Sequence, residues 1–223
     1  MPELCLYIAP GACSRVPLIA LESTGYPFRT ELVRFMKGEH KSVQFKTLNP
    51  SGKIPILEVD GEAIPQNVAI LTWLAKNFPD ASLLPDVHSS LQEAKLLSSL
   101  SRFSADLHPL VTRIRMPHFF CDREEGSQRV YEMAVVAMSE QLLQIEAELK
   151  ENTWLFGNQW SVLDAYLHWI WFRITGAGFD QTPFPNIALH YSRTLEIPAV
   201  QRAIEKEQAA EAQLKAEGLM PRF

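Results

Sequence analysis

The fold is decided by residues 49–70, which read NPSGKIPILEVDGEAIPQNVAI. The first four of these residues are turn formers, and the apolar positions over residues 56–59 predict a strand. The dipeptide Asp60-Gly61 favours a two-residue hairpin turn, so residues 63–64 predict a short return strand that Pro65 ends. From Val68 the apolar residues take helical spacing. The stretch therefore predicts a turn, a hairpin and a helix in succession.

Two places in this stretch suit a ligand. Pro55 follows a turn and begins a strand, where a cis bond would leave the backbone of Ile54 available to a ligand, although trans is the commoner form. Gln66 and Asn67 precede a helix, where side-chain amides and N–H groups can hold a carboxylate. The alternative is that both amides only cap the helix, and the residues alone leave this choice open.

A strand and a helix are predicted before this stretch. Residues 4–8 are almost wholly apolar, as expected of an interior strand, and a helix opens at Ser14 and ends at Gly25. Cys13 therefore lies at a helix N-terminus, where the helix dipole favours the thiolate and lowers the pKa of the sulfur. The alternative is that Cys13 is a small buried residue.

Composition excludes several functional classes. The 223 residues carry a formal net charge of −5, with a sequence pI of about 5.7, and no run of Lys and Arg occurs. Nucleic-acid binding is therefore disfavoured. No segment reaches the roughly 18 apolar residues of a membrane span, so we expect no membrane insertion and a cytoplasmic location. The three cysteines have neither disulfide nor metal-ligand spacing, so no metal is expected.

Residues 28–33 predict a second strand, and residues 42–48 predict a short helical turn. The predicted order of strand, helix, strand, helical turn, hairpin and helix is typical of a thioredoxin-like α/β domain. The chain resembles the glutathione S-transferases, most closely the bacterial beta class, and the resemblance covers essentially all of it. It is carried by Tyr7, residues 10–14 (PGACS), residues 49–55 (NPSGKIP) and residues 68–70 (VAI).

The resemblance implies site residues as well as a fold. It implies that Ile54 and a cis Pro55 bind the cysteinyl backbone of glutathione, with Lys53 pointing to the same site. It also places Cys13 where beta-class enzymes keep a cysteine that contacts glutathione, and Ser14 where other classes place a hydroxyl. These residues are the expected site for glutathione as co-substrate.

One pair of residues departs from the family pattern. The family usually has an acidic residue or glutamine followed by serine to hold the γ-glutamyl group, whereas this chain has Gln66-Asn67. Gln66 is an accepted variant, but Asn67 replaces a hydroxyl with a bulkier amide that can still donate to a carboxylate. The departure predicts weakened or altered glutathione affinity.

The second part of the chain is expected to be all helical. We expect a thioredoxin-like domain over residues 1–79, a proline-bounded linker over residues 80–86 and a helical domain over residues 87–223. Helices are predicted over residues 91–120, 127–150, 162–175, 187–195 and 198–217. Pro109 should kink the first of these helices, and Ser161 with Asp164 forms a capping-box pattern at the third.

Several side chains of the helical part have an expected role. His108 is either a structural histidine or, by resemblance, a residue that reaches the sulfur site. The aromatic residues Trp169, Trp171 and Phe172 are expected in the core, while Met116, Phe119 and Phe120 suit an apolar wall for a co-substrate.

Three hypotheses follow. In the first, a homodimeric transferase conjugates the glutathione thiolate to a small hydrophobic electrophile, with Cys13, Ser14 and His108 as catalytic candidates. In the second, Cys13 is the nucleophile of glutathione-dependent thiol-disulfide exchange. In the third, the chain is a binding protein on the same scaffold, since fold does not establish function.

Overall fold

The structure is a computed structural model that describes residues 2–219. The chain forms two compact units. The first contains the residues up to Leu83 together with the residues from Ile197 onwards, and the second runs from Leu84 to Glu196. Each unit is described by itself. No helix within residues 2–219 is both long and apolar enough to cross a membrane.

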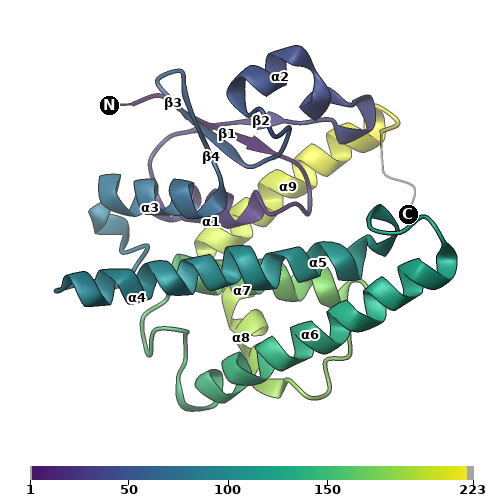
Figure 1. The fold of residues 1–223 in the computed structure, drawn as a ribbon. Coiled ribbons are helices and arrows are strands. Elements are labelled where there is room, and N and C mark those ends of the chain that lie inside the picture. Colours follow the sequence, from purple (N-terminus) through teal and green to yellow (C-terminus); the bar gives the residue numbers. More distant parts are fainter. Residues whose placement is uncertain (1, 220–223) are drawn as a thin grey trace. The chain divides into compact units, whose positions relative to one another are not determined.

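A four-stranded mixed sheet forms the centre of the first unit (Figure 1). Its order is β2 (Arg29–Leu32), β1 (Leu4–Ile8), β3 (Ile56–Val59) and β4 (Glu62–Pro65). β1 is parallel to β2 and antiparallel to β3, and β3 is antiparallel to β4. The predicted interior strand and the hairpin after it are both present.

Helices lie on both faces of this sheet (Figure 1). One face carries α2 (Val43–Leu48), whose buried Phe45 packs in a cluster with Ile54 and Ile56. The other carries α1 (Arg15–Thr24) and α3 (Asn67–Asn77), which pack on each other. These layers are those of the predicted thioredoxin-like domain.

The expectation that Pro65 ends strand pairing is wrong. Pro65 is the last residue of β4 and lies opposite Ile56 of β3. Because β4 is at the edge of the sheet, a proline without an N–H group is tolerated there.

The C-terminal helix α9 (Pro198–Ala216) belongs to the first unit by its contacts. It packs along α1, and salt bridges join the two helices at Arg15–Glu207 and Arg202–Glu22. The predicted division of the chain at residues 80–86 stays a prediction.

The second unit is helical. Its helices are α4 (Ser90–Ser101), α5 (His108–Arg115), α6 (Glu124–Glu151), α7 (Val162–Thr175) and α8 (Pro185–Leu195). Short 3-10 helices elsewhere in the chain span Phe35–Lys37, Glu39–Lys41, Pro79–Ala81 and Pro117–Phe119. The fold class predicted from the sequence, a thioredoxin-like domain followed by helices, is confirmed.

The first predicted helix, over residues 91–120, is not continuous. A π-helical stretch, Arg102–Leu107, joins α4 to α5, and the N–H of His108 bonds the carbonyl of Phe103 five residues back. Pro109 follows directly, and a proline cannot donate to the carbonyl four residues back and crowds it. The expected distortion at Pro109 therefore takes the form of a π-helical stretch. The prediction that the helix reaches residue 120 is wrong, because α5 ends before Pro117.

α7 is the most buried helix of the second unit. Trp171 and Tyr166 are almost inaccessible, and Trp169 is 3% exposed. The expectation that the tryptophans of this helix are core residues is therefore right, while Phe172 is half-buried.

The capping box predicted at α7 is present, and Asp164 does more than cap. One carboxylate oxygen accepts from the backbone N–H of Ser161 at 2.8 Å. The other accepts from the N–H of Leu155 and bonds Nε2 of His190, each at 2.9 Å. Because Asp164 is fully buried, these groups have no access to water if the carboxylate is removed.

We predict that Asp164→Ala lowers the free energy of unfolding by about 3 kcal/mol or more, because it leaves several buried donors without an acceptor. Denaturant unfolding checks this. The exposed Asp106 provides a control, since Asp106→Ala should stay within about 0.5 kcal/mol of the parent. Equal stability of the two variants would contradict the structural role of Asp164.

Candidate active site in the first unit

Cys13 lies in the turn between β1 and α1, at the start of α1. Its side chain is half-buried, and Sγ lies 3.6 Å from the carbonyl oxygen of Ile54. The cysteine is therefore next to the backbone that precedes Pro55. The Ile54–Pro55 bond is cis, as the resemblance implied.

Asn67 connects the start of α3 to the backbone of Cys13. Its side-chain Nδ2 donates to the backbone carbonyl of Cys13 at 3.3 Å, and the residue is 5% exposed. The start of α3, the start of α1 and the residues before β3 thus meet at one place. The structure brings together Cys13, Ile54, Pro55 and Asn67 among the predicted site residues.

Gln66 has an unusual backbone. Its φ of 77° and ψ of 127° lie in a region that costs free energy for a residue with a side chain. The side chain is exposed and makes no capping hydrogen bond to α3. Gln66 directly precedes Asn67, which bonds Cys13, so this strained residue with an exposed polar side chain is a candidate for ligand contact rather than for capping.

The side chain of Asn49 holds the backbone that precedes Ile54. Nδ2 of Asn49 donates to the carbonyl of Lys53 at 2.7 Å, and Oδ1 of Asn49 accepts from the N–H of Ser51 at 3.1 Å. The side chain of Lys53 is exposed. Within residues 2–219 the N–H of Ile54 donates no hydrogen bond, so this N–H can serve a ligand.

Ser14 occupies a different environment from Cys13. The residue is fully buried, and its Oγ accepts from the N–H of Ala9 at 3.3 Å and donates to the carbonyl of Ala9 at 3.4 Å. The hydroxyl therefore closes the turn between β1 and α1.

Tyr7 carries a hydroxyl on β1 that is also engaged. Its OH donates to Oε2 of Glu58 at 3.2 Å. Burial, followed by the charge of Glu58, raises the pKa of Tyr7 to about 12. Tyr7 therefore stays a neutral phenol at physiological pH.

His108 belongs to the second unit. Its Nδ1 lies 2.8 Å from the hydroxyl of Tyr166, and its ring contacts the Trp169 ring edge-on with centroids 4.6 Å apart. The histidine is thus held by α7, and its predicted support of the sulfur site stays a prediction.

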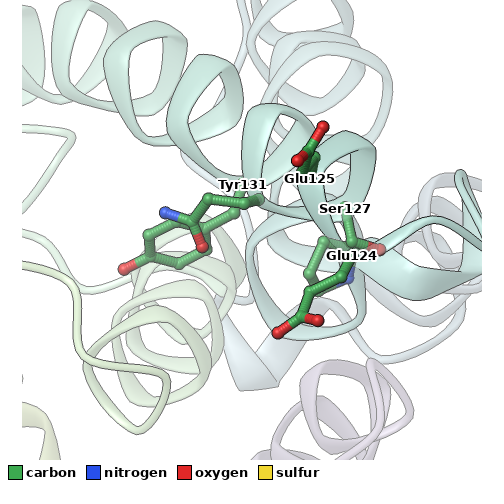
Figure 2. Close-up of a pocket in the computed structure, with 6 residues that line it drawn as sticks. Glu124, Glu125, Ser127 and Tyr131 are labelled. Atoms are coloured by element: carbon green, nitrogen blue, oxygen red, sulfur yellow. The ribbon is translucent and has the colours of Figure 1, made fainter.

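The residues expected to form an apolar wall are mostly open to solvent. Phe119 is 65% exposed, and Phe120, 47% exposed, lies under the guanidinium of Arg113 at 4.9 Å. Pro117, from the same short helix as Phe119, borders an open hollow of about 560 Å³. It is lined by Pro117, Glu124, Glu125, Ser127, Gln128 and Tyr131 (Figure 2).

This hollow has no arrangement suited to catalysis. Figure 2 shows that the carboxylates of Glu124 and Glu125 point in different directions, so they do not converge on one ligand. It contains none of the predicted site residues. We therefore place the candidate site at Cys13.

The sequence analysis did not single out Arg15 or Glu207, which also lie next to the loop that carries Cys13. Oε2 of Glu207, on α9, bonds Nε of Arg15 at 2.9 Å and accepts from the N–H of Gly11 at 3.4 Å. A signal for Glu207 was present, because it shares one helical face with the buried Ala203 and Ala210. A charged residue on an apolar face marks a buried ion pair.

Comparison with known proteins gives the family. Models of the N-terminal and C-terminal domains of glutathione S-transferase match residues 11–77 and 105–198. The chain belongs to the glutathione S-transferase family. It is 31% identical over 205 residues to glutathione S-transferase GstA of Escherichia coli O157:H7, covering 91% of this chain and 98% of that protein.

Solved structures agree with this assignment. The beta-class glutathione S-transferase of Sphingomonas chungbukensis is 32% identical and has a TM-score of 0.78, covering 91% of this chain and 98% of that one. A sphingomonad glutathione S-transferase complexed with glutathione is 31% identical, with a TM-score of 0.79 and coverages of 92% and 98%. The maleylacetoacetate isomerase of Dictyostelium discoideum is 25% identical over 201 residues, covering 88% of this chain and 90% of that protein.

A pH titration tests the assignment of Tyr7. Because the folded pKa of about 12 lies above the unfolded value of about 10, the associated stability is complete below pH 10 and is lost as pH rises towards 12. We expect the parent protein to show a tyrosine ionisation near pH 12 that is missing from the Tyr7→Phe protein. Ultraviolet absorbance measures this directly. A Tyr7→Phe protein with an unchanged titration curve would contradict the assignment.

Proposed function

We propose that the protein is a glutathione transferase whose co-substrate is held at the junction of Cys13, Ile54 and Asn67. The observation that carries the proposal is the Ile54 N–H, which donates no hydrogen bond within residues 2–219 and lies beside Cys13 and the start of α3. An extended tripeptide can bond such an N–H as an added strand does. Family membership supports glutathione as that tripeptide.

Each part of glutathione has a partner in this proposal. The cysteinyl backbone bonds Ile54, whose bond to Pro55 directs the chain into β3. The γ-glutamyl carboxylate lies at the start of α3, where the first N–H groups have no partner within the helix and Gln66 projects into solvent. The exposed ammonium group of Lys53 attracts the negatively charged tripeptide.

The proposed chemistry is attack by the glutathione thiolate. The sulfur forms a bond to an electrophilic carbon of a small apolar molecule, and a leaving group departs or a proton is added at the neighbouring atom. The enzyme's part is to favour the thiolate through the Cys13 thiol, as a hydrogen-bond donor, and through the positive end of the α1 dipole. His108 is proposed as a supporting residue. The bonds of Ser14 to Ala9 favour a positioning role for its hydroxyl.

Two other uses of glutathione share this site. A relative named maleylacetoacetate isomerase favours an isomerase, in which the thiolate adds to a conjugated double bond, rotation follows, and elimination returns glutathione. The half-buried Cys13 favours thiol-disulfide exchange. In that reaction the Cys13 thiolate attacks a glutathione mixed disulfide and releases the other thiol, and a second glutathione then restores Cys13 and leaves as glutathione disulfide.

A second copy of the chain is the partner that we propose. α6 carries the exposed apolar side chains Met133, Val136 and Leu143, which are three and seven residues apart and share one face. An exposed apolar stripe favours association. Val136→Glu should therefore shift a homodimer to monomer in analytical ultracentrifugation. A Val136→Glu protein with the parent's mass would contradict this interface.

Calorimetric titration with reduced glutathione tests the binding proposal. We expect saturable binding with a dissociation constant of about 1 mM or tighter, which corresponds to about 4 kcal/mol or more. Gln66→Ala should weaken binding by about tenfold, because it removes an amide beside a carboxylate at a helix start. Gln44 on α2 is an exposed amide remote from Cys13 in sequence, and Gln44→Ala should bind as the parent does. No heat with the parent protein would overturn the proposal.

Cys13→Ala separates the reactions. Conjugation should be reduced by about tenfold but persist, because the dipole of α1 remains. Thiol-disulfide exchange should vanish, because its nucleophile is gone. Complete loss of conjugation with glutathione binding intact would show that Cys13 is indispensable to thiolate formation and contradict the shared-donor arrangement.

A further inference from the structure

We propose that Glu207, from the C-terminal helix α9, is a positioning residue for the Cys13 thiol. Its carboxylate holds the chain on both sides of the cysteine, at Gly11 two residues before it and at Arg15 two residues after it. The inference rests on the proposed function only in taking Cys13 as the thiol of the site.

The contacts converge on one carboxylate oxygen. Oε2 of Glu207 bonds the N–H of Gly11 at 3.4 Å and Nε of Arg15 at 2.9 Å, and Nη2 of Arg15 also donates to it. Glu207 is 4% exposed and Arg15 is 6% exposed. A buried ion pair is costly to desolvate, and replacing it with apolar residues is often neutral for stability. A gain in folding stability is therefore a weak explanation for the buried Arg15–Glu207 ion pair.

Position gives the stronger reason. Gly11 has a φ of 69°, so the turn before Cys13 is in a left-handed conformation that the N–H contact to Glu207 secures. On the other side, Arg15 is the first residue of α1, where a positive charge opposes the helix dipole. The carboxylate neutralises Arg15 and fixes the start of the helix whose N–H groups lie beside Cys13.

Two double variants isolate this role. Arg15→Met with Glu207→Gln removes the ion pair but keeps an oxygen that can accept from Gly11. Arg15→Met with Glu207→Leu removes the ion pair and the acceptor together. Both remove the buried charges, so a difference between them reports on the Gly11 contact.

The readout is alkylation of Cys13 by iodoacetamide in the absence of glutathione, measured across pH and localised on Cys13 by mass spectrometry. We expect the glutamine double variant to keep the parent's profile. The leucine double variant should alkylate about fivefold faster at its alkaline plateau, the size expected from the loss of one hydrogen bond that keeps the turn closed.

Arg202→Gln is the matched control. It breaks the contact between α9 and α1 at Glu22, near the other end of α1, where Lys206 still partners the glutamate. We expect this variant to lose stability without a change in the Cys13 profile. If the leucine double variant is only less stable, with the parent's profile, Glu207 is a structural residue and the proposal is overturned.

Amide hydrogen exchange of the parent protein gives a test that needs no variant. NMR should show that the Gly11 amide exchanges slowly with solvent, because its N–H donates a hydrogen bond to a buried carboxylate. Exchange at the rate of an exposed loop amide would overturn the proposal even if the leucine variant does not fold. Neither measurement uses glutathione, so a parent that fails to bind glutathione contradicts the proposed function and leaves this test decisive.

Discussion

The pairing register of β1, β3 and β4 brings the segments of the candidate site to one end of the sheet. β1 lies inside the sheet, and because β3 runs antiparallel to it, the end of β1 lies beside the start of β3, with Tyr7 opposite Ile56. β4 returns antiparallel, so Pro65 at its end also lies opposite Ile56. The loop with Cys13, the Ile54–Pro55 bond and the start of α3 therefore meet at one end of the sheet as a consequence of strand pairing.

α9 completes the first unit through charges rather than apolar contacts alone. Arg202 and Lys206 bond Glu22, Glu207 bonds Arg15, and beyond the helix Glu217 bonds Arg34. The hydrogen bonds from Arg34 lower the pKa of Glu217 to about 2, so this outer contact persists over the physiological pH range. A helix that follows the second unit in sequence thus helps to fix the loop before Cys13.

Local sequence rules predicted the elements better than the contacts between them. The Asp60-Gly61 hairpin and the Ser161–Asp164 capping box depend on residues close in sequence, and both are present. The sequence predicts a kink at Pro109 but not its π-helical form, because a proline within a helix allows several distortions. The burial of Glu207 depends on a partner 192 residues away, so helix prediction alone could not pair it with Arg15.

The surroundings of Cys13 act on its protonation in opposite directions. The start of α1 favours the thiolate, whereas a carbonyl oxygen 3.6 Å from Sγ favours the thiol, because only the S–H can donate to it. The conjugation proposed above needs a Cys13 thiol that donates to the ligand sulfur instead of to the Ile54 carbonyl. Exchange needs the opposite, a Cys13 thiolate that forms before the disulfide arrives. The Ile54 carbonyl contact is therefore the feature of this site on which the two proposed chemistries make opposite demands.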